Sequence, residues 1–159
     1  MKKTTKIFSL LFAFILCMGI MSVNVFAANY SKKTTDTASL PGYELYAYVR
    51  FYELVREVHV MSQVRPIDST YSIDMELRTD ITVQYADGSF ETGRNHLENE
   101  VVGGNSSYLT SNLYFDLNTE KIVDVIYTHH GFFSDDENLS HYMYVDMYAG
   151  VDFPEEILE

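Results

Sequence analysis

The side chains best suited to chemistry in this sequence gather in the stretch YTHHGFFSDDENLSHYMYVDMY, residues 127–148. Three histidines flank an acidic run there, two before it and one after it, and the candidate site comprises His129, His141, Asp135, Asp136 and Glu137. Imidazole nitrogens and carboxylate oxygens bind divalent transition metals, and a histidine beside a carboxylate can exchange protons. We therefore treat this set as a candidate metal site for a divalent cation, and the sequence indicates no other cofactor.

The geometry of that site depends on how the flanking segments pair. If residues 122–130 and 141–149 form an antiparallel hairpin, their apolar faces should coincide. That register predicts that His129 and His141 share the core face and that His130 points outward. The spacing matches no diagnostic ligand motif, so a hairpin loop that binds no metal is the alternative. A calcium loop would space its oxygen ligands more regularly.

A second candidate is an aromatic row on the last predicted strand, where three tyrosines alternate with Met143, Val145 and Met147. The predicted binding surface comprises Tyr142, Tyr144, Tyr148, Ile122 and Ile126. A sheet with apolar side chains on both faces must be covered twice. Either another part of the chain covers this row, or it binds another molecule.

Motifs for other chemistries are missing. The chain has no GxSxG sequence for a serine nucleophile, and Gly103-Gly104 is not followed by the lysine of a phosphate-binding loop. His59 and His96 each stand alone on probable strand sequence and are read as surface residues. The sequence therefore assigns no catalytic residue.

The first 27 residues have the features of a secretory signal peptide. Lysines precede an apolar run over 7–21, and a small-residue pattern ends at Ala27. We expect cleavage there and a secreted, extracellular protein; the competing interpretation, a membrane anchor, would need a longer apolar run. The one cysteine, Cys17, lies in this segment, which excludes disulfides and thiolate metal sites from the rest of the chain. The lack of cysteine in the rest of the chain is compatible with a bacterial secreted protein.

The net charge of the chain limits the classes of partner that it is expected to bind. The chain carries 23 acidic and 11 basic side chains, a formal net charge of −12, which disfavours nucleic acid and direct docking to anionic membranes. Cations and basic partners are favoured instead. The sequence also has 13 tyrosines and no tryptophan, and tyrosine suits both half-exposed strand faces and contact surfaces.

Alternating apolar and polar residues predict most of the fold. The clearest strand runs over 73–85, and Asp87-Gly88 after it is a strong hairpin signal. Further strands are expected over 109–117, 122–130 and 141–149. The prediction is a mainly β domain, a small antiparallel sandwich or an open barrel of five to six strands.

One N-terminal segment is harder to assign. Residues 43–56 have helical spacing of Leu45, Tyr48, Tyr52 and Val55, which predicts a covering helix and, as the alternative fold, an α+β sheet. The organisation expected is a signal peptide over 1–27, a flexible leader over 28–41, one β-rich domain over 42–153 and an acidic tail over 154–159.

The sequence thus favours a secreted, non-catalytic binding or accessory module whose partner is a protein or a surface ligand. The alternative is a small secreted hydrolase that depends on a metal or on histidine at the acidic hairpin. A secreted antibacterial or toxin-like protein is a weaker alternative, because the acidic charge would repel it from anionic envelopes.

Overall fold

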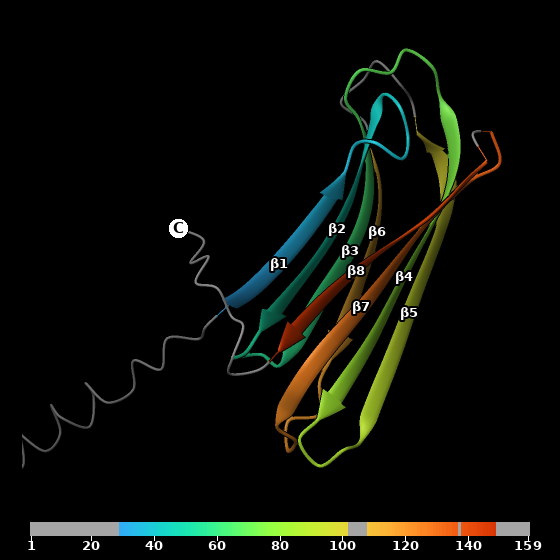
Figure 1. Ribbon diagram of the computed structural model, residues 1–159. Helices are drawn as coiled ribbons and strands as arrows, with labels where there is room; N and C mark the ends of the chain where they lie inside the picture. Colours follow the sequence, from blue (N-terminus) through green and yellow to red (C-terminus); the bar gives the residue numbers. More distant parts are fainter. Residues whose placement is uncertain (1–28, 102–107, 137, 149–159) are drawn as a thin grey trace, which may run out of the picture.

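The structure is a computed structural model that describes residues 29–101, 108–136 and 138–148. The elements of this part of the chain are eight β-strands: β1 (Asn29–Asp36), β2 (Tyr43–Tyr52), β3 (Glu57–Pro66), β4 (Ile73–Tyr85), β5 (Phe90–Val101), β6 (Leu109–Asp116), β7 (Val123–Ser134) and β8 (Leu139–Tyr148). They form a first sheet, β1-β2-β3-β6, and a second sheet, β5-β4-β7-β8, which lie against each other as two layers (Figure 1). The mainly β prediction is confirmed, with more strands than expected. No helix that could cross a membrane occurs among the described residues.

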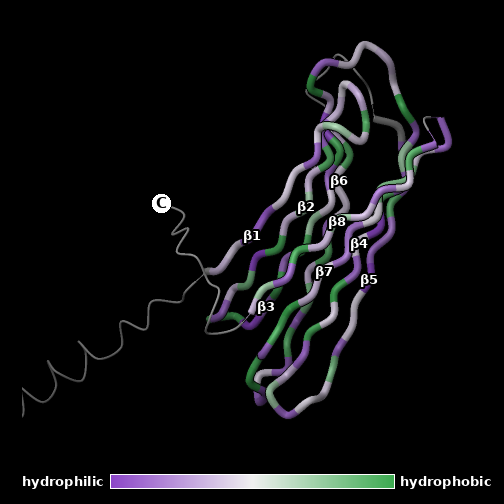
Figure 2. The backbone as a smooth tube through the Cα atoms, in the orientation of Figure 1, coloured by the Kyte–Doolittle hydropathy of each residue, from purple (hydrophilic) through white to green (hydrophobic). Residues whose placement is uncertain are grey.

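One apolar core fills the space between the two sheets. Along β4 every second residue from Ile73 to Tyr85 is buried, and the residues between them are wholly or partly exposed. The alternation along the strands is visible in Figure 2. Both layers contribute fully buried side chains to this core, including Leu45, Val49, Val60, Leu77, Val83 and Phe132. The two-residue period of a strand is what directs each set inward.

The predicted helix over 43–56 is wrong. Residues 43–52 form β2, which pairs with β3 along its whole length and with β1 over residues 45–52. Leu45, Ala47, Val49 and Phe51 are buried at every second position. Aromatic and β-branched side chains pack well on a pleated surface, and the neighbouring strands supply backbone partners that a local pattern cannot reveal. The α+β alternative is wrong for the same reason.

The predicted flexible leader is also wrong over most of its length. Asn29–Asp36 forms the edge strand β1, antiparallel to β2. Its polar sequence is typical of an edge strand, since one side of such a strand meets solvent. The domain therefore begins earlier than residue 42, whereas the predicted signal peptide and the acidic tail over 154–159 lie outside the described residues.

The β4–β5 hairpin forms where Asp87-Gly88 predicted it. The Tyr85 N–H donates to the Ser89 carbonyl at 2.9 Å, and the Gly88 N–H donates to the Tyr85 carbonyl at 2.9 Å. Gly88 has φ of +82°, a left-handed conformation that glycine adopts without steric cost. The turn sets the register of the two strands that follow from it.

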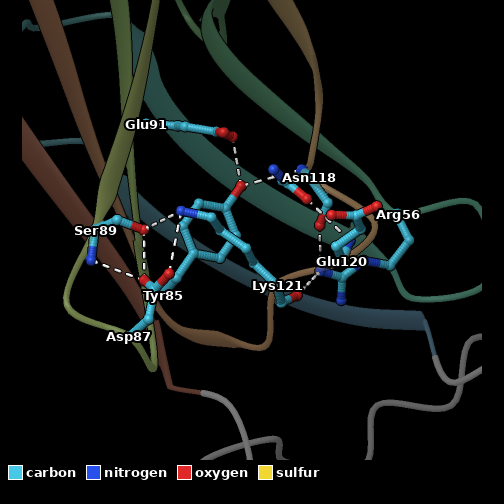
Figure 3. A network of polar contacts seen from close by, with 8 residues as sticks. All are labelled: Arg56, Tyr85, Asp87, Ser89, Glu91, Asn118, Glu120 and Lys121. Atoms are coloured by element: carbon cyan, nitrogen blue, oxygen red, sulfur yellow. Dashed lines mark hydrogen bonds and ion pairs between the residues drawn. The ribbon is translucent and has the colours of Figure 1, made fainter.

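Side chains from three turns meet at this end of the sandwich (Figure 3). The Tyr85 hydroxyl donates to the Glu91 carboxylate and accepts the Asn118 N–H at 3.1 Å. The Arg56 guanidinium donates to the Asn118 carbonyl at 2.9 Å and also to the carbonyl of Lys121. Because Arg56 follows β2 and Tyr85 ends β4, this network joins the turns of both sheets.

The exposed turn carries its own ion pair. The Lys121 ammonium lies 3.1 Å from the Asp87 carboxylate, and the Ser89 hydroxyl and N–H donate to the same carboxylate. The Ser89 hydrogen bonds, followed by Lys121, lower the pKa of Asp87 to about 2. The contacts hold the β4–β5 turn against the β6–β7 turn.

The lateral edges of the sandwich are bridged by side chains. Lys32 of β1 donates to the Asp146 carbonyl of β8 at 2.8 Å, and Asn95 of β5 donates to the Asn112 carbonyl of β6 at 2.8 Å. Edge strands with unpaired backbone groups invite pairing with other chains. These contacts occupy one carbonyl on each of the edge strands β8 and β6.

Candidate binding surface

The outer side of the second sheet exposes a cluster of aromatic rings, which we call the tyrosine face. It comprises Tyr142, Tyr144 and Tyr148 of β8 and His129 and Phe133 of β7. The three tyrosines are 45%, 66% and 39% exposed. No described residue forms a layer over this side of the sheet, as Figure 1 shows.

The alternation of β8 directs these rings outward. Met143, Val145 and Met147 are buried in the core, so the tyrosines between them must point to the opposite side. The register then places Tyr144 directly opposite His129. The outward direction predicted for the tyrosines is confirmed.

The rings pack on each other. The His129 imidazole stacks on the Tyr144 ring, with centroids 4.9 Å apart and planes 5° apart, and it lies 4.9 Å from the Tyr142 ring. The Tyr142 ring meets the Phe133 ring edge to face at 5.5 Å. Such ring pairs restrict side-chain rotation, so the rings are ordered before any contact with another molecule.

Gly131 gives the cluster its room. A Cβ placed on Gly131 would lie 2.7 Å from the Phe133 ring, so this ring lies over the bare glycine backbone. Tyr142 is the cross-strand neighbour of Gly131 and reaches the same space. A glycine at this position therefore allows the two rings to meet, and a larger residue would force Phe133 to move.

A charged row adjoins the rings. Asp80 of β4 lies opposite Arg94 of β5 and His129 of β7, and Tyr144 of β8 completes the row across four strands. The Asp80 carboxylate is 2.5 Å from the Arg94 guanidinium and 3.8 Å from Nδ1 of His129. Arg78 also contacts Asp80, at 3.4 Å. Nε2 of His129 is buried and has no hydrogen-bond partner among the residues that the structure describes.

The outer side of the first sheet has a comparable but more enclosed set of rings. His59 stacks on Tyr114 at 4.4 Å, and arginine side chains lie over Tyr46 and Tyr48. Tyr48 is only 9% exposed, and burial raises its pKa to about 12. Because Arg50 and Arg65 already cover these rings, the first sheet offers less free aromatic surface than the tyrosine face.

The register predicted for the histidines is wrong. His130 is buried opposite Met143, whereas His129 points outward, the reverse of the prediction. The β4–β7 register shifts where Gln84 faces Val125 and Tyr85 faces Val123, so β7 carries one extra residue there. Such a bulge reverses which residues of a strand face the core, and the local sequence did not reveal it.

The structure disperses the described residues of the predicted metal site. His141 and His129 lie on opposite sides of the second sheet. Nε2 of His141 is 3.0 Å from the Asp36 carboxylate of β1, in the first sheet. Asp136 accepts the Asp74 N–H at 3.0 Å, and Asp135 lines a hollow beside β4. Glu137 lies outside the described residues.

The two isoleucines assigned to the binding surface are not part of the tyrosine face. Ile126 is 1% exposed and lies opposite the core residue Met147, because the bulge turns it inward. Ile122 is 75% exposed but precedes β7, outside the strand pairing. His129 and Phe133 take their places, and a correct β7 register would have identified both.

A serine and a histidine also meet in the core. Ser62 Oγ is 2.9 Å from Nδ1 of His130, the separation expected of a nucleophile and its base. Both side chains are 0% exposed, and the other ring nitrogen contacts Thr128 rather than a carboxylate. A substrate cannot reach the pair in this structure, so its role here is to join the two sheets.

Comparisons with known proteins give only distant likenesses. No family model matches the chain, and no curated protein matches its sequence. Among solved structures, CsgH of R. palustris is 8% identical, with 75% of this chain and 92% of that chain covered and a TM-score of 0.35. A Bacteroides uniformis beta-glucuronidase is 11% identical, with 75% and 13% covered and a TM-score of 0.34. Spo0M, a sporulation control protein from Bacillus subtilis, is 9% identical, with 76% and 49% covered and a TM-score of 0.33. Likenesses this weak carry no argument about function.

Proposed function

We propose that the protein is an exported, non-catalytic binding module that holds a cationic segment of a partner protein on its tyrosine face. The signal-peptide features of residues 1–27 support export. The observation that carries the binding role is the exposed ring cluster, in which Tyr144 is 66% exposed yet stacked on His129. Exposed aromatic clusters of this kind are enriched at protein contact surfaces.

Charge supports a cationic partner. The chain has a formal net charge of −12, which attracts basic proteins over long distances. Beside the tyrosine face, on the same side of the sheet, Asp146 is opposite Tyr127, and Glu76 is opposite Phe133. Arginine and lysine side chains bind both to carboxylates and to the faces of tyrosine rings, so one segment can use both.

The test compares matched tyrosines on the two sheets. An oligo-arginine peptide is titrated into the purified protein and into a Tyr142→Ala/Tyr144→Ala variant, with an oligo-glutamate peptide as the opposite-charge control. Tyr114→Ala is the control variant, because Tyr114 is 62% exposed and stacks on His59 much as Tyr144 stacks on His129.

We expect the double variant to weaken oligo-arginine binding about tenfold or more, the loss typical of removing central aromatic contacts. Tyr114→Ala should bind as the wild type does, and the oligo-glutamate peptide should not bind. Unchanged binding by the double variant would mean that the peptide responds only to overall charge, and equal weakening by Tyr114→Ala would mean that the tyrosine face has no special part; either outcome would make the proposal wrong.

A further inference from the structure

Three potential metal ligands converge on the outer side of the second sheet, and none of them belongs to the predicted hairpin site. Glu76 of β4 lies directly opposite Glu98 of β5, and His96 is two residues before Glu98 on the same side of the strand. One ligand atom from each residue lies within 4.8 Å of the other two. Strand pairing thus assembles one imidazole and two carboxylates.

The separations suit direct coordination. Nε2 of His96 is 3.1 Å from Oε1 of Glu76 and 3.4 Å from Oε1 of Glu98. Ligand atoms bound to zinc at about 2.0–2.2 Å lie roughly 3.3–3.6 Å from one another in a tetrahedral site. The histidine and the carboxylates can therefore close around one ion with small side-chain movements.

The charges also favour a cation. Like charges directly opposite each other destabilise an antiparallel pair, and the ion pairs that Glu76 and Glu98 make within the described residues are those with His96. Arg78, opposite His96, directs its Nε toward Asp80 at 3.4 Å. A bound divalent ion would offset the repulsion between the two carboxylates.

The surroundings leave space for further ligands. The side chains of Glu76, His96 and Glu98 are 40%, 49% and 71% exposed, so water can complete the coordination. Glu76 and Glu98 also line an open hollow of about 500 Å³, and Asp74 and Asp135 line the same hollow. The site is thus accessible from solvent.

We propose that Glu76, His96 and Glu98 form a binding site for a divalent transition-metal ion, best matched by Zn²⁺. Calcium and magnesium prefer all-oxygen ligand sets, whereas an imidazole with carboxylates suits zinc and its transition-metal neighbours. The site adjoins the tyrosine face, since Glu76 is opposite Phe133, but the two tests change different residues, so either proposal can fail while the other holds.

The test is a calorimetric titration of untagged protein with ZnCl₂, followed by His96→Asn and Glu76→Gln variants. His59→Asn is the matched control, because His59 is also a strand histidine on the outer side of a sheet but lies on the first sheet beside Asn112. Thermal unfolding without metal confirms that each variant folds. A parallel titration with CaCl₂ separates zinc binding from general attraction of divalent cations.

We expect one Zn²⁺ per chain, with affinity about tenfold or more weaker in His96→Asn and Glu76→Gln, as loss of a ligand requires. His59→Asn should bind as the wild type does. No zinc binding, or equal binding by wild type and His96→Asn, would overturn the proposal. Calcium binding that is as tight as zinc binding and indifferent to His96→Asn would overturn it too.

Discussion

Ser62 of β3 and His130 of β7 are hydrogen-bonded across the core, with Oγ 2.9 Å from Nδ1 and both side chains fully buried. Thr128 donates to the Val145 carbonyl at 2.8 Å and lies 2.8 Å from Nε2 of His130. Its oxygen therefore accepts the Nε2 proton, and Nδ1 accepts the Ser62 hydroxyl. A neutral histidine thus links the first sheet to the second with both ring nitrogens satisfied.

We predict that His130→Ala lowers the free energy of unfolding by about 3 kcal/mol, because it leaves a cavity and removes a partner from two buried hydroxyls. Urea unfolding measures the change. His129→Ala is the control, since His129 lies on the outer surface and its removal should cost about 1 kcal/mol or less. Equal losses at the two positions would contradict a special role for the core histidine.

Acid should destabilise the protein through the same residue. Burial, followed by the charge of His129, lowers the pKa of His130 from 6.5 to about 3. The unfolded chain therefore takes up this proton first, and stability is lost as pH falls from 6.5 toward 3, by up to about 1.4 kcal/mol per pH unit.

Comparison with a variant isolates this contribution from other titrating groups. The difference in unfolding free energy between wild type and His130→Gln should shrink by about 2 kcal/mol between pH 7 and pH 5. Urea unfolding at the two pH values measures it. A difference that stays constant would show that His130 does not resist protonation in the folded protein.

Tyr85→Phe should destabilise the protein by about 1–2 kcal/mol, because the Asn118 N–H and the Glu91 carboxylate both lose the hydroxyl. Thermal unfolding measures the loss, and amide hydrogen exchange should become faster at Asn118. Tyr108→Phe, at a 60% exposed ring, is the control and should change neither quantity. Unchanged exchange at Asn118 in Tyr85→Phe would argue against the network of Figure 3.

Gly93→Ala should cost about 1–3 kcal/mol, the usual range for overpacking. A Cβ there would lie 2.7 Å from the Phe115 ring of the opposite sheet and 3.2 Å from Cγ2 of Ile81. Denaturant unfolding measures the loss, and Thr92→Ala, at an exposed neighbour, should stay within about 0.5 kcal/mol of the wild type. If Gly93→Ala leaves the free energy of unfolding unchanged, the Phe115 ring moves aside without cost and the expected overpacking is absent.

The zinc ligands show how much one turn can determine. The Asp87-Gly88 hairpin was predicted from its sequence, and its observed closing pair, Tyr85 and Ser89, places Glu76 opposite Glu98 by counting along both strands. The prediction that His96 is an isolated surface residue is made without this register, which places His96 beside Glu98 and Glu76. The hairpin sequence and its turn are therefore enough to derive that Glu76 lies opposite Glu98.

Other features depended on distant partners. Residues 43–52 carry apolar residues that fit a helix or a strand, and only pairing with β1 and β3 decided between them. The polar segment Asn29–Asp36 could not have been identified as a strand without β2 beside it. Short segments of ambiguous pattern take the structure that their neighbours can hydrogen-bond.

The sequence by itself determined the mainly β class, the alternation over 73–85, the Asp87-Gly88 turn and the outward tyrosines of β8, since each follows from the two-residue period or from glycine's conformational freedom. Only the tertiary structure decided which of His129 and His130 faces the core. One extra residue in β7 reverses the sides, and the pairing with β4 places that residue. The buried Ser62–His130 bridge and the exposed His129–Tyr144 stack both follow from that single shift.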